Sequence, residues 1–108
     1  MVYFEITSET GKRIRTTKGY WEMITKQKHP IIEELETEVK ETIKSPNEVR
    51  QSRKDNSIHL YYKRYPTLKN RFICVLIKCL NKNGFVVSAY LADNVKKGEV
   101  VWRKKKLR

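Results

Sequence analysis

The sequence has little glycine, little cysteine and no long apolar run. Its four Gly form neither a phosphate-binding loop nor a dinucleotide-binding motif, and the G-x-S-x-G pattern of serine hydrolases is missing. No apolar stretch approaches the roughly 20 residues that a membrane-spanning helix needs. The N-terminus, MVYFEITSE, also lacks the basic and apolar regions of a signal peptide. We therefore expect a cytoplasmic protein that has no membrane partner.

The few cysteines and histidines fit neither a disulfide nor a metal site. Cys74 and Cys79 fall in one apolar run. In a strand they would lie roughly 16 Å apart, at ~3.3 Å per residue, and on opposite faces, which is too far for a disulfide. Two Cys and two His at these spacings match no zinc pattern. The glutamates gather on one predicted helix rather than in a magnesium site, so we expect no metal and no cofactor.

The charge of the chain is positive and unevenly distributed. There are 24 Lys and Arg against 12 Asp and Glu, which gives a net charge of +12. Residues 33–41 hold five Glu and one Lys, a local charge of −4, so the rest of the chain carries +16. Such a surface attracts polyanions, of which RNA, DNA and anionic membranes are the usual examples. The alternative is a basic surface that has no function of its own.

The first third of the chain predicts a hairpin followed by two helices. Two β-prone runs, residues 2–7 and 12–17, flank the turn residues SETG and predict an N-terminal hairpin over residues 1–18. Residues 20–28 favour a short helix. Pro30 then disfavours helical geometry at His29 and suits the first turn of a new helix. We therefore expect His29 at a break between two helices.

The second helix shows the clearest periodicity in the sequence. Apolar residues recur at every fourth position, and glutamates occupy the remaining surface, which is typical of an amphipathic helix of about three to four turns. The residues expected to face the core are Ile31, Leu35, Val39 and Ile43, with Ile32 beside them. The turn-forming sequence Ser45-Pro46-Asn47 ends the helix.

The rest of the chain reads as strands separated by turns. We expect strands at residues 49–53, 58–64, 71–80 and 85–92 and a short fifth at 100–102, with a hairpin turn at NKNG. The predicted fold class is α+β: two N-terminal helices packed on one face of a four- to five-stranded antiparallel sheet, together with the N-terminal hairpin. We expect a single domain over residues 1–108 that ends in a disordered basic tail, residues 103–108.

Strand alternation assigns side chains to the two faces of this sheet. If the apolar parity faces the helices, that face holds Val49, Ile58, Leu60, Tyr62, Phe85, Val87, Ala89 and Leu91. The open face then holds Arg50, Ser52, His59, Tyr61, Lys63, Ser88 and Tyr90, with Arg53 at the end of its strand. Basic residues bind phosphates and tyrosines stack on bases, so this face is a candidate nucleic-acid site. A solvated polar face without function is the alternative.

Metal-independent RNA cleavage needs few chemical groups. A base takes the proton of the ribose 2′-OH, and the oxygen attacks the adjacent phosphate to leave a 2′,3′-cyclic phosphate end. Histidine suits the acid or base role because its pKa lies near neutrality. Arginine and lysine stabilise the charge that develops on the phosphate.

Several motifs, in their order along the chain, resemble a known family. They are HP between the two helices, SPNEVRQS, LYYK, FVVSAY and KKGEVVW. The set resembles the small phage-associated nucleases grouped with barnase, EndoU, colicin and RelE-type ribonucleases, from about Trp21 to Trp102. The resemblance implies two N-terminal helices against a four-stranded antiparallel sheet. It also implies toxin-like cleavage of tRNA or mRNA without a metal.

The resemblance also implies roles for individual residues. His29 is the acid or base, and Glu99 and Trp102 close the structure. The basic and hydroxyl positions of the motifs fall on Arg50, Ser52, Tyr62, Lys63, Ser88 and Tyr90. Strand alternation would instead choose His59, but we favour His29 because a loop residue can reach the rim of a site. Its alternative role is a helix cap.

We thus expect a metal-independent, toxin-like endoribonuclease. Its predicted catalytic residues are His29, Arg50, Tyr62, Lys63 and Ser88, and its predicted RNA-binding residues are Ser52, Arg53, His59, Tyr61 and Tyr90. The expected partners are RNA and an acidic antitoxin or immunity protein that covers the basic face. One alternative is a non-catalytic RNA- or DNA-binding module, and another is a protein-interaction domain that uses the acidic helix.

Overall fold

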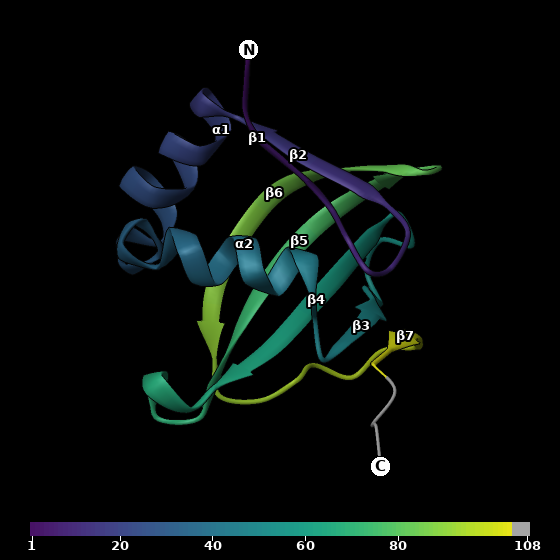
Figure 1. Ribbon diagram of the computed structural model, residues 1–108. Coiled ribbons are helices and arrows are strands. Elements are labelled where there is room, and N and C mark those ends of the chain that lie inside the picture. The colour runs from purple at the N-terminus through teal and green to yellow at the C-terminus, as the bar shows by residue number, and fades with distance from the viewer. Residues whose placement is uncertain (105–108) are drawn as a thin grey trace.

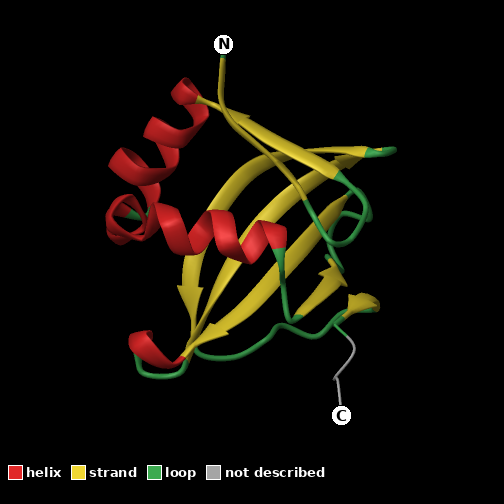
Figure 2. Cartoon of the chain, in the orientation of Figure 1, coloured by secondary structure: helices red, strands yellow, loops and turns green. Residues whose placement is uncertain are grey.

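The computed structural model describes residues 1–104 and has an α+β architecture (Figures 1 and 2). Its strands are β1 (Val2–Thr7), β2 (Arg13–Thr17), β3 (Glu48–Gln51), β4 (Ile58–Tyr65), β5 (Arg71–Leu80), β6 (Asn83–Ala92) and β7 (Val100–Arg103). The helical segments are α1 (Lys18–Glu22), η1 (Met23–Lys28), η2 (Pro30–Leu35), α2 (Glu36–Lys44) and η3 (Pro66–Leu68). The α1 segment continues directly into η1, and η2 into α2, so two helices precede β3.

The strands of this described region form one sheet of seven in the order β1-β2-β6-β5-β4-β3-β7. All neighbours are antiparallel except β2 and β6, which pair in parallel between residues 13–15 and 83–85. The prediction of a four- to five-stranded antiparallel sheet is therefore wrong in size and in type. The N-terminal hairpin is confirmed, but it extends the main sheet because β2 pairs with the edge of β6.

Both helices lie against the same face of the sheet, which we call the helix face (Figure 1). Their buried side chains include Trp21, Ile24, Ile32, Leu35, Val39 and Ile43. These pack on sheet residues that include Val49, Tyr61, Ile73, Val75, Ile77, Val86 and Ala89. Removal of one such side chain from water stabilises the fold by about 1.5–3 kcal/mol. Because this cluster contains most of the buried apolar side chains, it is the main core.

The start of the second helix differs from the predicted pattern. Ile31 is 48% exposed, whereas Ile32 is fully buried. The cause is that Pro30–Leu35 is a 3₁₀ helix. Such a helix has three residues per turn, so positions i and i+3 share a face, and Ile32 and Leu35 turn toward the core together.

The break between the helices lies at His29, as the sequence predicts. Its backbone angles, φ −139° and ψ 79°, are not helical. The His29 N–H donates to the Ile24 carbonyl and so ends η1, while the His29 carbonyl accepts from the Ile32 N–H and so begins η2. Pro30 is the first residue of η2, where its missing N–H costs no hydrogen bond.

The opposite side of the sheet, which we call the outer face, has a smaller apolar cluster to which no helix contributes. It contains Leu60, Tyr62 and Cys74, with Ile58, Phe72, Leu76, Tyr90 and Val95 packed around them. Val95 belongs to residues 93–99, the connection from β6 to β7, which we call the strap. This face is therefore partly covered rather than open.

Strand alternation predicts the faces of β3 correctly and those of β4 wrongly. Val49 faces the helices as expected, but in β4 Tyr61 packs in the main core, and Leu60 and Tyr62 face outward. In β6, Ala89 and Leu91 face the helices as expected. Val86 rather than Phe85 or Val87 joins them, because a register shift between Leu76 and Ile77 changes the alternation.

The C-terminal end of the described chain pairs with the segment before β3. Arg103, at the start of the predicted basic tail, belongs to β7, and the Lys104 N–H donates to the Asn47 carbonyl at 3.0 Å. The remaining residues of that tail, 105–108, lie outside the described residues. Over residues 1–104, no helix is both long and apolar enough to cross a bilayer.

Candidate nucleic-acid interface

A groove of about 300 Å³ lies on the outer face. Leu60, Leu76 and Tyr90 from three neighbouring strands line it with mostly apolar surface. The loop after β3 and the strap supply its polar lining, which is Ser52, Arg53, Lys54, Lys96 and Lys97. Four positive charges thus surround a partly apolar surface. That combination suits a nucleotide, because the base can rest on the apolar part while phosphates contact the cations.

The strap is held in place along its length. Val95 packs on the outer cluster, and the Lys96 N–H donates to the Tyr62 hydroxyl at 3.1 Å. Further on, the Arg50 guanidinium donates to the Gly98 carbonyl at 3.4 Å, and the Gln51 N–H donates to the Glu99 carbonyl at 2.8 Å. These contacts place the two strap lysines beside the groove.

Tyr90 connects the groove to the predicted catalytic histidine. The Lys96 Nζ lies 5.5 Å from the centre of the Tyr90 ring, within the range of a cation–π contact. The centre of the His29 ring lies 5.7 Å from the same ring centre, at an interplanar angle of 36°. This approach is possible because β2 pairs with β6 only as far as Phe85, and η1 and η2 pack against β6.

Most of the predicted site residues gather around this groove. Ser52, Arg53 and Tyr90 line it, and Ser88 lies opposite Leu76 in the neighbouring strand. Tyr62 is fully buried beneath the strap, and burial, with a smaller contribution from Cys74, raises the pKa of Tyr62 to about 12. Its hydroxyl therefore stays protonated near neutral pH.

Arg50 is near the groove, but its charge is already paired. Its Nε donates to the Glu48 carboxylate at 2.7 Å, and Arg103 approaches the same carboxylate oxygen at 3.6 Å. Because its guanidinium also contacts Gly98, Arg50 has a clear role in fixing the strap.

Three predicted residues lie on the other side of the sheet. Tyr61 is fully buried in the main core, where its hydroxyl is 2.8 Å from the Thr10 hydroxyl. Lys63 donates to the Ser45 carbonyl at 2.9 Å. His59 lines a separate pocket of about 90 Å³ with Tyr61 and Lys12, and burial, then the charge of Lys12, lowers the pKa of His59. A ligand in the groove does not reach these three side chains.

Three lysines that line the groove were not predicted from the sequence: Lys54, Lys96 and Lys97. Lys54 lies in a stretch that reads only as a turn, and the strap lysines lie in a segment without regular structure. The signal that could have found the two strap lysines is the basic run Lys96-Lys97 between two predicted strands. Their location on the outer face depends on the path of the strap, which no local pattern reveals.

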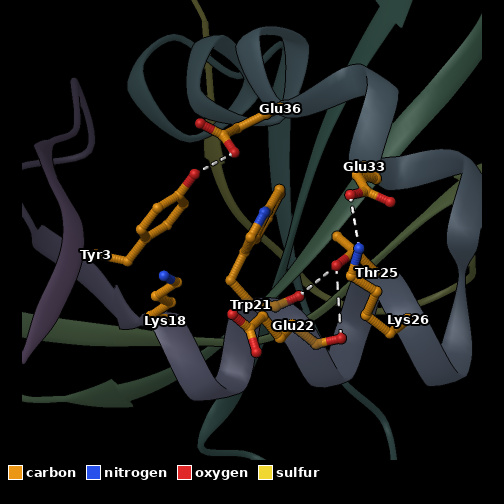
Figure 3. Close-up of a pocket in the computed structure, with 8 residues that line it drawn as sticks. All are labelled: Tyr3, Lys18, Trp21, Glu22, Thr25, Lys26, Glu33 and Glu36. Atoms are coloured by element: carbon orange, nitrogen blue, oxygen red, sulfur yellow. Dashed lines mark hydrogen bonds and ion pairs between the residues drawn. The ribbon is translucent and has the colours of Figure 1, made fainter.

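A second pocket, of about 190 Å³, lies on the helix side of the molecule (Figure 3). Its lining is Tyr3, Lys18, Trp21, Glu22, Thr25, Lys26, Glu33 and Glu36. The Lys26 ammonium pairs with Glu33 at 2.9 Å, and the Tyr3 hydroxyl donates to Glu36 at 2.7 Å. With three glutamates against two lysines, this pocket does not favour a polyanion, in contrast to the groove.

The groove residues include no metal-ligating cluster. Across the described part of the chain, no three Cys, His, Asp or Glu side chains gather in a way that could hold a metal ion. Comparison of the chain with models of known families, with curated proteins and with solved structures yields no match. The likeness to phage-associated nucleases therefore rests on the sequence motifs alone.

Proposed function

We propose that this protein is a metal-independent, toxin-like endoribonuclease that binds RNA in the outer-face groove. The observation that supports this most strongly is the position of His29 beside Tyr90, a residue that also lines the groove. An imidazole thus lies beside one of the residues that line a groove with four cationic side chains. General base catalysis and charge stabilisation are the two effects that cleavage by the ribose 2′-OH needs most.

In the proposed reaction, His29 takes the proton of the 2′-OH as the oxygen attacks the adjacent phosphorus. The bond from phosphorus to the 5′-oxygen breaks, and water supplies the proton that this leaving oxygen takes up. The products are a 2′,3′-cyclic phosphate and a free 5′-OH. Lys96 and Lys97, which border the groove, stabilise the additional negative charge on the phosphate oxygens.

The same groove is the surface that an inhibitor would cover. We propose an acidic antitoxin or immunity protein as that partner, because carboxylates complement the cations around the groove. Glu33 and Glu36 are on the other side of the molecule and are engaged with Lys26 and Tyr3, so they leave the groove free of competing carboxylates.

The test is cleavage of total tRNA and of mRNA by purified protein in EDTA. His59→Ala is the matched control, because it removes the other histidine from the opposite side of the sheet. We expect the unmodified protein and His59→Ala to cleave, and His29→Ala to be slower by about 10²–10⁴-fold. Equal rates for His29→Ala and the unmodified protein would refute the catalytic role of His29. Dependence of cleavage on added Mg²⁺ would refute the metal-independent mechanism.

A non-catalytic RNA-binding module is the second candidate. His59 and Lys63 lie on the helix face, so His29 is the one histidine near the groove, and no second histidine can act there as the acid. Cleavage commonly uses two groups, one for each proton transfer. This candidate predicts no cleavage by any variant, together with an affinity for RNA whose logarithm falls linearly with the logarithm of the salt concentration.

A further inference from the structure

The strap connects strands that lie far apart in the sheet. It leaves the end of β6 and reaches β7, so it passes β5, β4 and β3 (Figure 1). It has no helix or strand of its own to fix its path. Its position therefore depends on a few contacts with the outer face, and the position of Lys96 and Lys97 depends on the strap.

The contact at the centre of the strap is made by Tyr62. This side chain is fully buried, and its hydroxyl accepts the Lys96 N–H at 3.1 Å. Val95, the preceding residue, packs on the same cluster as Tyr62. The hydroxyl is thus bonded to the backbone of a residue whose side chain borders the groove.

The far end of the strap is fixed to β3. A side chain at Gly98 would place its Cβ 2.5 Å from the Gln51 carbonyl oxygen, so the strap approaches β3 too closely for any other residue. With this end fixed, the Tyr62 hydrogen bond decides how the middle of the strap lies over the outer face.

We propose that Tyr62 is a positioning residue: its buried hydroxyl holds the strap so that Lys96 and Lys97 contact the phosphates of RNA in the groove. The proposal deepens the RNA-binding function proposed above and rests on it. It gives Tyr62 a role that needs no proton transfer, in agreement with the fully buried position of its side chain.

The neighbouring residue supplies a matched control. Tyr61 is also fully buried, and its hydroxyl is also hydrogen-bonded, to Thr10 at 2.8 Å. It faces the helices, however, and does not contact the strap. Tyr61→Phe and Tyr62→Phe therefore remove the same group from the same strand, and only the second change affects the strap.

The experiment measures the affinity for a fluorescent single-stranded RNA with 2′-O-methyl groups, which cannot be cleaved, over a range of salt concentrations. Lys96→Gln with Lys97→Gln should reduce the salt slope by about 1.4, because each phosphate contact contributes about 0.7 for single strands. Tyr62→Phe should reduce the slope by part of that amount and weaken binding roughly 2- to 10-fold, the effect of one hydrogen bond. Tyr61→Phe should leave the slope unchanged.

Two additions separate a positioning role from general destabilisation. Tyr62→Phe should weaken binding no further when both lysines have already been replaced, because it acts through them. Amide hydrogen exchange of residues 93–99 should be faster in Tyr62→Phe than in Tyr61→Phe. If Tyr62→Phe does not fold, Val95→Ala replaces it, because this change loosens the strap through its other central contact.

The outcomes distinguish this inference from the proposed function. If the unmodified protein has no salt-dependent affinity for RNA, the proposed function fails, and the inference fails with it. If the lysine variant loses slope but Tyr62→Phe and Tyr61→Phe behave alike, the function stands and the inference is overturned. Additive effects of Tyr62→Phe and the lysine changes would also overturn it.

Discussion

The two faces of the sheet differ in what covers them. Two helices pack over the helix face and bury a large continuous core there. The outer face has a small apolar cluster, covered only by the strap and bordered by cationic side chains. Residues on the helix face therefore contribute mainly to stability. The outer face contributes less to stability, because its cluster contains fewer buried side chains, and its partly exposed residues lie where a ligand can contact them.

Two adjacent residues of strand β4 show the difference between the helix face and the outer face. Tyr61 and Tyr62 are equally buried, yet one joins the main core and the other supports the strap. The degree of burial thus does not reveal whether a residue stabilises the fold or supports the groove. The segment that covers the residue, a helix or the strap, reveals which role it has.

The largest expected effect is a stability difference between two residues of β5. Ile73 is fully buried on the helix face, and Leu76 is partly buried in the groove. Ile73→Ala should leave a cavity in the core and lower the free energy of unfolding by about 2–5 kcal/mol. Leu76→Ala should lower it less and weaken RNA binding, because it removes apolar surface from the groove. Urea unfolding and fluorescence anisotropy measure the two effects, and equal losses of stability would contradict the comparison.

The second prediction concerns the stability of the fold at high pH. Burial raises the pKa of Tyr61 and of Tyr62 from 10.0 to about 12. In the unfolded chain the phenols ionise near pH 10, whereas in the folded protein they stay protonated until about pH 12. Their stabilising effect is therefore complete below pH 10 and is lost as the pH rises toward the folded pKa, with a slope of about 1.4 kcal/mol per pH unit for each phenol.

Urea unfolding at several pH values tests this prediction. Tyr61→Phe and Tyr62→Phe should each make the loss of stability above pH 10 less steep, because one ionising phenol is gone. If only one of the two variants changes the pH dependence, then the two faces do not shield their tyrosines equally.

Local chemistry explains why much of the fold could be predicted. The N-terminal hairpin, the break at His29 and the bounds of β5 follow from turn residues, from proline and from an uninterrupted apolar run. Both parities of this run are apolar, and β5 contributes buried side chains to both clusters. Each of these features depends on residues within a few positions of one another.

The features that could not be predicted depend on distant partners. The parallel pairing of β2 with β6 joins residues about 70 positions apart in sequence, and the β-prone pattern of β2 names no partner. Polarity alone assigns the faces of β4 wrongly, because the outer face also has an apolar cluster, which the strap partly covers. For the same reason Lys96 and Lys97 could not be placed at the groove.

The third prediction compares two glycines that are tightly surrounded. An alanine Cβ at Gly84 would lie 2.6 Å from the Ile77 side chain, on the helix face. Gly84→Ala should thus overpack the core and cost about 1–3 kcal/mol of stability, with RNA affinity unchanged. Gly98→Ala should displace the strap from Gln51. Its loss of free energy of RNA binding should therefore exceed its loss of free energy of unfolding.

Gly19→Ala serves as the control for both changes. Beyond the adjacent residues and the backbone of the helix itself, no atom lies within 4 Å of the position its Cβ would occupy, and alanine is favoured in a helix such as α1. We expect its stability to equal or exceed that of the unmodified protein. If fully folded Gly84→Ala protein bound RNA more weakly than the unmodified protein, the core and the groove would be coupled, contrary to the prediction.

The smallest expected effect separates the groove from the total charge. Lys26→Gln and Lys97→Gln each remove one positive charge, the first from the helix side and the second from the groove. Lys26 pairs with Glu33 at 2.9 Å on the surface, and exposed ion pairs contribute little to stability. Lys26→Gln should therefore change neither the free energy of unfolding nor the salt slope of RNA binding appreciably.

Lys97→Gln should reduce the slope by about 0.7, the value for one phosphate contact. Equal reductions in both variants would mean that RNA responds to the net charge of +12 rather than to the groove, and the difference between the two faces would then concern stability alone.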